Sequence, residues 1–330
     1  MPDVSLPFSE RIRDERPERR LAAVAEALKP GAERPRTEDV APLVDDADES
    51  VRQLAVVLLG QMGAAAVPAL VRALGQKQPT LIRAFAASGL AQAGSGASPA
   101  AEALGTCLAS PEESLRIPAA LALSRIGASA LPVLRRALAA REGPTAVLAA
   151  RSLGWMGRDA SPAAEDLKRL SASSSGETRI AALAALAAVT GSAKDLGPLT
   201  AIVQGSDRAL RKEAIDRIGE LKDLGRGLAP VLRRCLEDSA APVRASAALA
   251  LARVGSREAE TREALIRLRK DPDVQARFHA AIALAPFGDS VAQTLREMAG
   301  DSDAGVAAVA AAGLHAMKAS ATTPAQAPKG

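Results

Sequence analysis

Residues with the types and spacing that chemistry needs are scarce in this chain. The two histidines, His279 and His315, have no cysteine near them, and the metal-binding spacings His-x-x-Glu and Cys-x-x-Cys do not occur. The stretch GSGAS at 94–98 follows a predicted helix rather than a strand, which argues against a phosphate-binding loop. No serine–histidine–aspartate set or carboxylate pair is indicated either. The sequence therefore predicts a protein that is not an enzyme and that holds no metal or cofactor.

The chain repeats one amphipathic helix, which we name helix B. Aligned on Arg52 as position zero, nine copies follow one another at intervals of 30 to 33 residues. Position zero holds Arg52, Arg83, Arg116, Ala146, Arg179, Arg211, Arg244, Arg277 and Ala307. Position +3 holds Ala55, Ala86, Ala119, Ala149, Ala182, Ala214, Ala247, Ala280 and Ala310. Positions +7 and +10 are apolar in every copy, and a fixed period of this length is typical of stacked helical repeats.

A second and more variable helix, helix A, precedes the copies of helix B. It has an early proline, as at Pro68, Pro132 and Pro230, where the first-turn N–H has no helical acceptor. Aromatic residues make up only 2% of the chain, and the alternation typical of strands is missing. We therefore expect an all-α protein built from pairs of a helix A and a helix B.

This pairing resembles the HEAT repeat. A Pro-x-Leu helix is followed by a turn aspartate and by Val-Arg-x-x-Ala, and Asp46, Asp238 and Asp271 each stand six residues before the arginine. The resemblance implies an α-solenoid, a right-handed superhelix of about nine HEAT-like helix pairs. The alanine-rich units are similar to bacterial HEAT repeats related to phycobilin lyase subunits. The turn aspartate is missing at Lys77, Ser110, Ala140 and Ser173.

The two ends of the chain differ from the repeats. Residues 1–16 are polar and charged and are expected to be flexible, and residues 17–37 are expected to contain a capping helix. The solenoid is predicted to occupy residues 38–318. The tail, residues 319–330, has no apolar period and should be disordered.

The repeated positions suggest how neighbouring repeats pack. Positions −1, +3, +7 and +10 share one face of helix B, so the repeats on either side must cover this apolar stripe. Alanine at +3 lets the backbones of adjacent helices approach closely. We expect the arginine at zero to bond turn carbonyls and carboxylates of a neighbouring repeat, and the turn aspartate to cap helix B.

The cysteines and the apolar runs bear on the compartment. Cys107 and Cys235 lie in similar helix A positions four repeats apart, too far for a disulfide, and are interpreted as core residues. Residues 1–20 lack the apolar segment of a secretory signal, and no apolar run approaches the roughly 18 residues of a membrane span. We expect a cytoplasmic protein that does not contact a membrane.

Positions +1, +5 and +8 face away from the core and line the concave side of HEAT-like arrays. Many of them are apolar, either because successive B helices pack together or because they form a groove for a partner's helix or extended peptide. Trp155, the sole tryptophan, either fills a gap between repeats or anchors a partner, since tryptophan and arginine are enriched at binding hot spots. The predicted partner-binding residues are Ile117, Leu121, Val147, Arg151, Trp155 and Arg158.

Three classes of function stay open. The favoured class is a non-enzymatic scaffold that binds another protein. The alternative is nucleic-acid binding along a basic ridge of helix A, although aromatic residues for base stacking are scarce and the net charge is only +4. A bilin-lyase-like accessory subunit is implied by the resemblance alone, and we name no catalytic residue for it. The ridge consists of Arg72, Arg135, Arg136, Lys168, Arg169, Arg233, Arg234, Arg267, Arg269 and Lys270.

Overall fold

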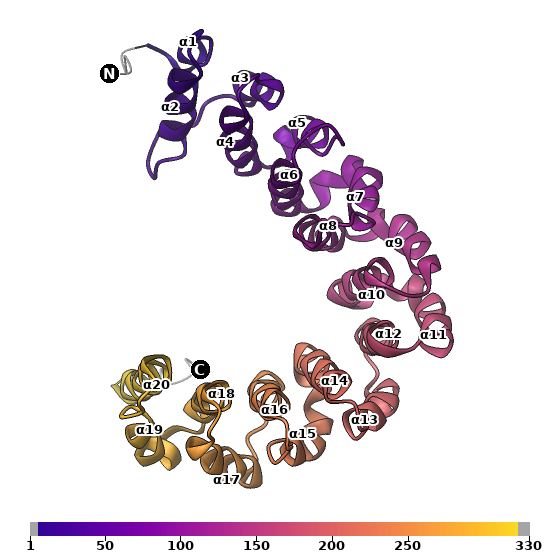
Figure 1. Ribbon diagram of the computed structural model, residues 1–330, viewed down its shortest axis with the longest axis vertical. Helices are drawn as coiled ribbons and strands as arrows, with labels where there is room; N and C mark the ends of the chain where they lie inside the picture. Colours follow the sequence, from indigo (N-terminus) through magenta and orange to yellow (C-terminus); the bar gives the residue numbers. More distant parts are fainter. Residues whose placement is uncertain (1–5, 323–330) are drawn as a thin grey trace, which may run out of the picture. The chain divides into compact units, whose positions relative to one another are not determined.

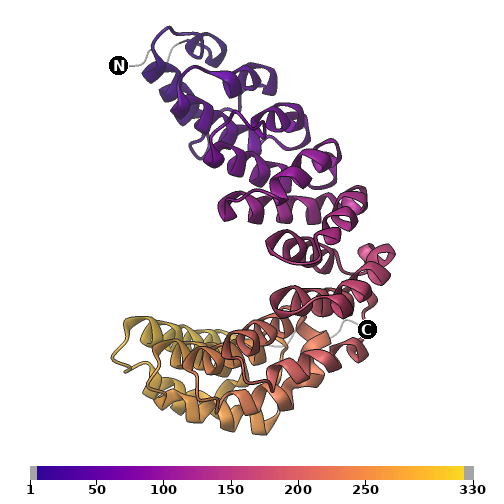
Figure 2. The same ribbon diagram turned by 45° about the vertical axis from the view of Figure 1, so that its right-hand side comes forward.

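The computed structural model describes residues 6–322, with side chains described as far as Met317. All regular secondary structure in this range is helical, which confirms the predicted all-α class. The chain divides into two compact units, Met1–Thr190 and Gly191–Gly330. Each unit is a stack of helix pairs (Figure 1, Figure 2).

Unit 1 arranges its helices in two rows, with the B helices on the inner side (Figure 1). The B helices are α2 (Pro17–Ala27), α4 (Glu49–Gly60), α6 (Thr80–Ala93), α8 (Glu113–Ile126), α10 (Pro144–Met156) and α12 (Gly176–Thr190). The A helices are α1 (Phe8–Arg11), α3 (Thr37–Val40), α5 (Val67–Ala73), α7 (Ala101–Leu108), α9 (Leu131–Ala137) and α11 (Ala164–Ser173). Short 3₁₀ segments extend these helices: η1 (Ala41–Asp45), η2 (Gly63–Ala66), η3 (Gly94–Ala100), η4 (Gly127–Ala130), η5 (Leu138–Ala140) and η6 (Gly157–Ala163).

Unit 2 repeats the same two-row arrangement. Its B helices are α14 (Arg208–Glu220), α16 (Ala241–Arg253), α18 (Val274–Leu284) and α20 (Ala304–Thr322). Its A helices are α13 (Gly197–Val203), α15 (Ala229–Cys235), α17 (Ala259–Arg267) and α19 (Ala292–Met298). Its 3₁₀ segments are η7 (Ala193–Leu196), η8 (Lys222–Leu228), η9 (Leu268–Lys270) and η10 (Ala285–Val291).

Small residues occupy the places where neighbouring B helices pack, and the alanines at position +3 are among the most buried residues of the chain. All nine are fully buried, at 0% exposure. The backbones of neighbouring B helices approach closely enough that a Cβ placed on Gly89 of α6 would lie 2.7 Å from the Gly60 Cα of α4. Small side chains are therefore required where helices B meet, because a larger group would overpack the interface.

Arginines at position zero join successive turns, as predicted. In unit 2, Arg211 donates two hydrogen bonds to Asp238, both at 2.9 Å, and its Nη1 donates to the carbonyls of Gly205 and Ser206. The pairs Arg244–Asp271 and Arg277–Asp301 have the same geometry. Where the next turn lacks the aspartate, this pair is absent: Arg116 bonds the carbonyls of its own turn, Ser110 and Pro111, and Arg83 bonds the Leu74 carbonyl and the Cys107 Sγ of the next repeat.

The expectation that the same aspartate caps helix B is wrong. Asp46 accepts the backbone N–H of Asp48 and two hydrogen bonds from Arg20, so its oxygens are already engaged. The cap is the aspartate two residues later: Asp48 accepts the backbone N–H of Val51, and Asp273 accepts that of Ala276. One turn therefore uses two aspartates. The first accepts hydrogen bonds from the arginine of the preceding repeat, and the second accepts a free backbone N–H in the first turn of helix B.

The N-terminal helix α2 shares features with the B helices of the repeats. Arg20 stands at position zero of α2, and its side chain donates to the carbonyls of Asp14 and Glu15 and to the carboxylate of Asp46. Ala23, at +3, is buried at 2% exposure. The sequence pattern was weaker here because positions +7 and +10 are alanine and proline instead of large apolar residues.

The predicted flexible and disordered ends need two corrections. Phe8–Arg11 forms α1 and is tied to α2 by the ion pair of Arg11 with Glu26 at 3.0 Å, so residues 8–11 are ordered. At the other end α20 continues to Thr322, because its alanine-rich sequence extends the helix past the last apolar position. The parts of these two segments at residues 1–5 and 323–330 lie outside the described residues.

One segment is long and apolar enough to resemble a membrane span. Glu113–Ala140 has 28 residues and a mean hydropathy of 1.5 in its most apolar window. It is not a straight helix, because Gly127 has a φ of +77° and separates α8 from η4 and α9. Neither α8 nor α9 alone has the length of roughly 20 residues that a bilayer requires.

Candidate partner-binding surface

An exposed apolar surface lies on α8 and α10. Ile117 is 45% exposed, Leu121 39% and Trp155 41%. Ile117 and Leu121 are four residues apart and share one side of α8, and α10 packs beside it. The three side chains thus lie on adjacent helices, although their type favours burial. We name Ile117, Leu121, Val147, Arg151 and Trp155 the α8/α10 surface.

On α10 the predicted residues form a single stripe. Val147, Arg151 and Trp155 are spaced four residues apart, so they follow one another along the helix. The guanidinium carbon of Arg151 lies 5.2 Å from the centroid of the Trp155 ring, a cation–π contact. Val147 is half-buried against the core. Trp155 is thus partly exposed, with the Arg151 guanidinium against its ring.

Positions +1 and +5, which hold Ile117 and Leu121 in α8, are buried in the adjacent repeats of α6 and α12 where they are apolar. Ala84 of α6 is 8% exposed, and Ile180 and Ala184 of α12 are 0% and 7% exposed. In unit 2, Ala245 of α16 is 5% exposed. Apolar residues at these positions thus serve the packing between helices in most repeats. The exposed part of the predicted groove in unit 1 is confined to α8 and α10.

Two exposed arginines border this surface. Arg158, which the sequence predicted, lies in η6 directly after α10, and Arg125, which it did not, lies in the last turn of α8. Among the described residues, neither guanidinium has a hydrogen-bond or ion-pair partner. Arg125 and Trp155 occupy the same position, +9, of adjacent repeats, and this periodic placement could have revealed Arg125 from the sequence.

The cations of the helix A ridge have a different environment. Arg135 and Arg169 both pair with Asp166, and Arg136 pairs with Glu102 at 2.6 Å. Further pairs join Arg72 to Asp45, Arg267 to Glu237 and Arg269 to Glu297. Most of the ridge arginines therefore have their charge offset by carboxylates, most of them in the preceding or the following repeat, and the ridge is not a continuous positive track.

The cysteines and His279 have structural environments. Burial raises the pKa of the Cys235 thiol to about 11, and burial likewise raises that of Cys107 although Arg83 opposes it. Both are buried free thiols, as predicted for core residues. A ring nitrogen of His279 lies 2.9 Å from the carbonyl oxygen of Ala245 on the preceding B helix. The described residues hold no group of three His, Cys, Asp or Glu side chains that could bind a metal.

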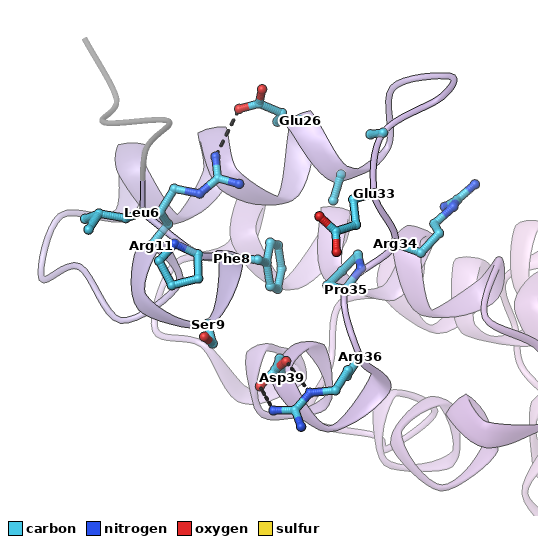
Figure 3. A pocket seen from close by; sticks show the side chains of 13 residues that line it. Leu6, Phe8, Ser9, Arg11, Glu26, Glu33, Arg34, Pro35, Arg36 and Asp39 are labelled. Carbon is cyan, nitrogen blue, oxygen red and sulfur yellow. Dashed lines mark hydrogen bonds and ion pairs between the residues drawn. The ribbon is translucent and has the colours of Figure 1, made fainter.

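A pocket of about 750 Å³ lies at the N-terminal end of unit 1 (Figure 3). It is lined by α1, the end of α2, the following loop and α3, and the ring of Phe8 faces it (Figure 3). Its charges are largely matched, because Arg11 pairs with Glu26 and Arg36 with Asp39 at 3.2 Å. We assign no ligand to this pocket.

The stacked helix pairs and the exposed inner face define a solenoid of helical repeats. A family model described as HEAT repeats matches residues 37–124 and 228–315, more than half of the chain. The chain therefore belongs to the HEAT-repeat family, which confirms the resemblance found in the sequence.

Solved structures with a similar fold include importin β, at 13% identity and a TM-score of 0.55, over 97% of this chain and 52% of that chain. The complex of CpcE and CpcF of phycocyanin lyase from Nostoc matches 78% of this chain and 96% of that chain, with 21% identity and a TM-score of 0.45. The match to an engineered protein covers 94% of this chain and 98% of that chain, with 21% identity and a TM-score of 0.39. No match was found among curated protein sequences. The likeness to importin β shows the fold alone.

Proposed function

We propose that this HEAT-repeat chain is a non-enzymatic scaffold that binds another protein through the α8/α10 surface. The observation that carries the proposal is the joint exposure of Ile117, Leu121 and Trp155 on adjacent helices. Apolar residues at +1 and +5 are buried in the adjacent repeats of α6 and α12, so the exposure of Ile117 and Leu121 is an exception to the packing scheme, whereas position +9, which holds Trp155, is also exposed in the adjacent repeat of α8. Exposed apolar groups that gather at one place are typical of protein interaction sites.

The exposed area is large enough to contribute to binding. Covering the exposed 41% of Trp155 would remove on the order of 100 Å² from water, worth about 2.5 kcal/mol. We expect the cation–π contact with Arg151 to favour one orientation of the indole ring, which would lower the entropy lost when a partner binds. Trp155 is therefore the proposed anchor of the interface.

The compartment belongs to the same proposal. Both cysteines are buried free thiols, which suits a reducing environment, so we propose that the scaffold acts in the cytoplasm. The alanine-rich repeats support a bacterial source. Nucleic-acid binding is not proposed, because the helix A arginines are mostly paired with carboxylates.

The test is capture of partners from a native cell extract by the full chain, with quantitative mass spectrometry. Trp155→Ala and Arg151→Glu are expected to reduce recovery of the specific partner at least severalfold while leaving the melting temperature nearly unchanged. Val274→Ala is the matched control, because Val274 is also an exposed apolar residue, at 37%, but lies on α18 of unit 2. Unchanged recovery with Trp155→Ala, or loss of recovery only with Arg135→Glu and Arg136→Glu together, would contradict the proposal.

A further inference from the structure

We propose that the α8/α10 surface selects a partner segment that carries apolar side chains followed by carboxylates. The inference deepens the proposed function and rests on it. It starts from Arg125 and Arg158, which are exposed and lack an ion-pair partner among the described residues. Several other exposed arginines of unit 1 have a carboxylate partner, as Arg136 does with Glu102 at 2.6 Å and Arg135 with Asp166.

Positive charge gathers at the C-terminal end of the surface. Arg125 ends α8, Arg158 follows α10, and Arg151 lies beside Trp155. Carboxylates are few and mostly distant: Glu113 lies at the opposite end of α8, and Asp159 alone adjoins Arg158. An acidic group of a partner would therefore meet a net positive field here, whereas a basic group would be repelled.

The spacing along α8 sets the pattern that the partner needs. Ile117, Leu121 and Arg125 are four residues apart, so the apolar part and the arginine are separated by roughly 6 to 12 Å along the helix axis. A partner helix that lies along α8 would place apolar residues at i and i+4 against Ile117 and Leu121. Its carboxylates at i+7 and i+8 would then reach Arg125 and Arg158.

A protein segment fits this surface better than a lipid bilayer. The B helices lie on the inner side of the curved row of unit 1 (Figure 1), which a narrow segment can enter and a flat membrane cannot cover. Base stacking is also unsupported, because the surface has one aromatic residue. We therefore commit to an acidic, amphipathic segment of another protein as the occupant.

The probes are three labelled synthetic peptides of about 20 residues with leucine at i and i+4. They carry glutamate, glutamine or lysine at i+7 and i+8, and binding to the full chain is measured by fluorescence polarisation. We expect the glutamate peptide to bind most tightly. Arg125→Glu with Arg158→Glu should weaken its binding about tenfold or more and strengthen binding of the lysine peptide, because the charges are then exchanged.

Arg253→Glu is the matched control. Arg253 is exposed, ends α16 and occupies the same repeat position, +9, as Arg125, so its replacement makes the same change in net charge as Arg125→Glu alone, away from the surface. It should leave the binding of all three peptides within twofold of the wild type.

Two results would overturn the inference and leave the proposed function standing. One is equal binding of the three peptides with Trp155→Ala weakening all of them, which would show an apolar surface without charge selection. The other is tighter binding to vesicles of phosphatidylglycerol than to the glutamate peptide, lost with Arg125→Glu. If no peptide binds and Trp155→Ala retains the cellular partner, both the inference and the proposed function are wrong.

Discussion

Arg244 donates two hydrogen bonds to the carboxylate of Asp271 in the next repeat, from Nε and Nη2, both at 2.7 Å. Its Nη1 donates at 2.9 Å to the carbonyl oxygen of Asp238 in its own turn. One guanidinium therefore joins the turns of two successive repeats. Both side chains are largely buried, at 14% and 8% exposure, so neither would regain full hydration if its partner were removed.

We expect Arg244→Ala to lower the free energy of unfolding by about 2 kcal/mol, because it leaves a buried carboxylate without its charged donor. Urea denaturation followed by circular dichroism measures the change. Arg267→Ala is the control in the same unit: its pair with Glu237, at 3.3 Å, is exposed and should be worth less than about 0.5 kcal/mol. Similar losses of unfolding free energy in both variants would show that the buried Arg244–Asp271 pair contributes no more than an exposed pair.

The stability of unit 2 should fall in acid. Burial raises the pKa of Asp271, but hydrogen bonds from Arg244 and the Asp273 N–H outweigh it and hold the pKa below its usual range. For Asp301 the hydrogen bond from Arg277 is the main cause of a lowered pKa. A carboxylate with a lowered folded pKa stabilises fully above its unfolded pKa, near 4, and loses this contribution as the pH falls through the folded value.

The measurement is thermal unfolding between neutral pH and about pH 2.5 at fixed ionic strength. Asp271→Asn is expected to be less stable at neutral pH and to lose less stability on acidification, because one of the titrating carboxylates is gone. An acid dependence as steep as that of the wild type would show that Asp271 does not contribute.

Alanine at position +3 should not tolerate a larger side chain. Ala149 and Ala182 are both at 0% exposure between neighbouring B helices. Ala149→Leu or Ala182→Leu should lower stability by roughly 1–3 kcal/mol through overpacking, as measured by urea denaturation. Ala312→Leu is the control, since Ala312 is an exposed alanine inside α20, and it should melt with the wild type. If all three variants unfold at the same urea concentration as the wild type, the alignment of the repeats is wrong.

The N-terminal repeat can be tested through Arg20. Its pair with Asp46 has 13% and 7% exposed side chains, close to the values in unit 2. If α2 is the B helix of a full repeat, Arg20→Ala should raise the hydrogen-exchange rates of the backbone amides in α2 and α4 at least tenfold. Arg19→Ala, which removes an exposed partner of Asp14, should not do so. Unchanged exchange in Arg20→Ala would mean that α2 only covers the array.

The sequence predicted the helix pairs, the buried alanines and the arginine contacts because each depends on residues at fixed spacing within one or two repeats. It placed Trp155 and Ile117 on the exposed side for the same reason. It did not separate exposed apolar positions from packed ones: Ile117 and Ile180 share position +1, yet one is 45% exposed and the other 0%. That difference depends on how each pair of neighbouring helices packs, which the spacing along one helix does not determine.

Arg211, Arg244 and Arg277 all donate toward the C-terminus, each to the aspartate that opens the following repeat. If the segment from Asp238 to Lys270 were deleted, Arg211 would meet Asp271, and the new junction would carry the same two charges as the old ones. A duplication of that segment would also leave each position-zero arginine with an aspartate in the next turn. The helices at these junctions also pack closely, since a Cβ on Gly219 of α14 would lie 3.0 Å from the Cα of Ala250 in α16. The repeated arginine–aspartate pair thus lets a gene gain or lose a whole repeat of unit 2 without losing the charge contact between turns.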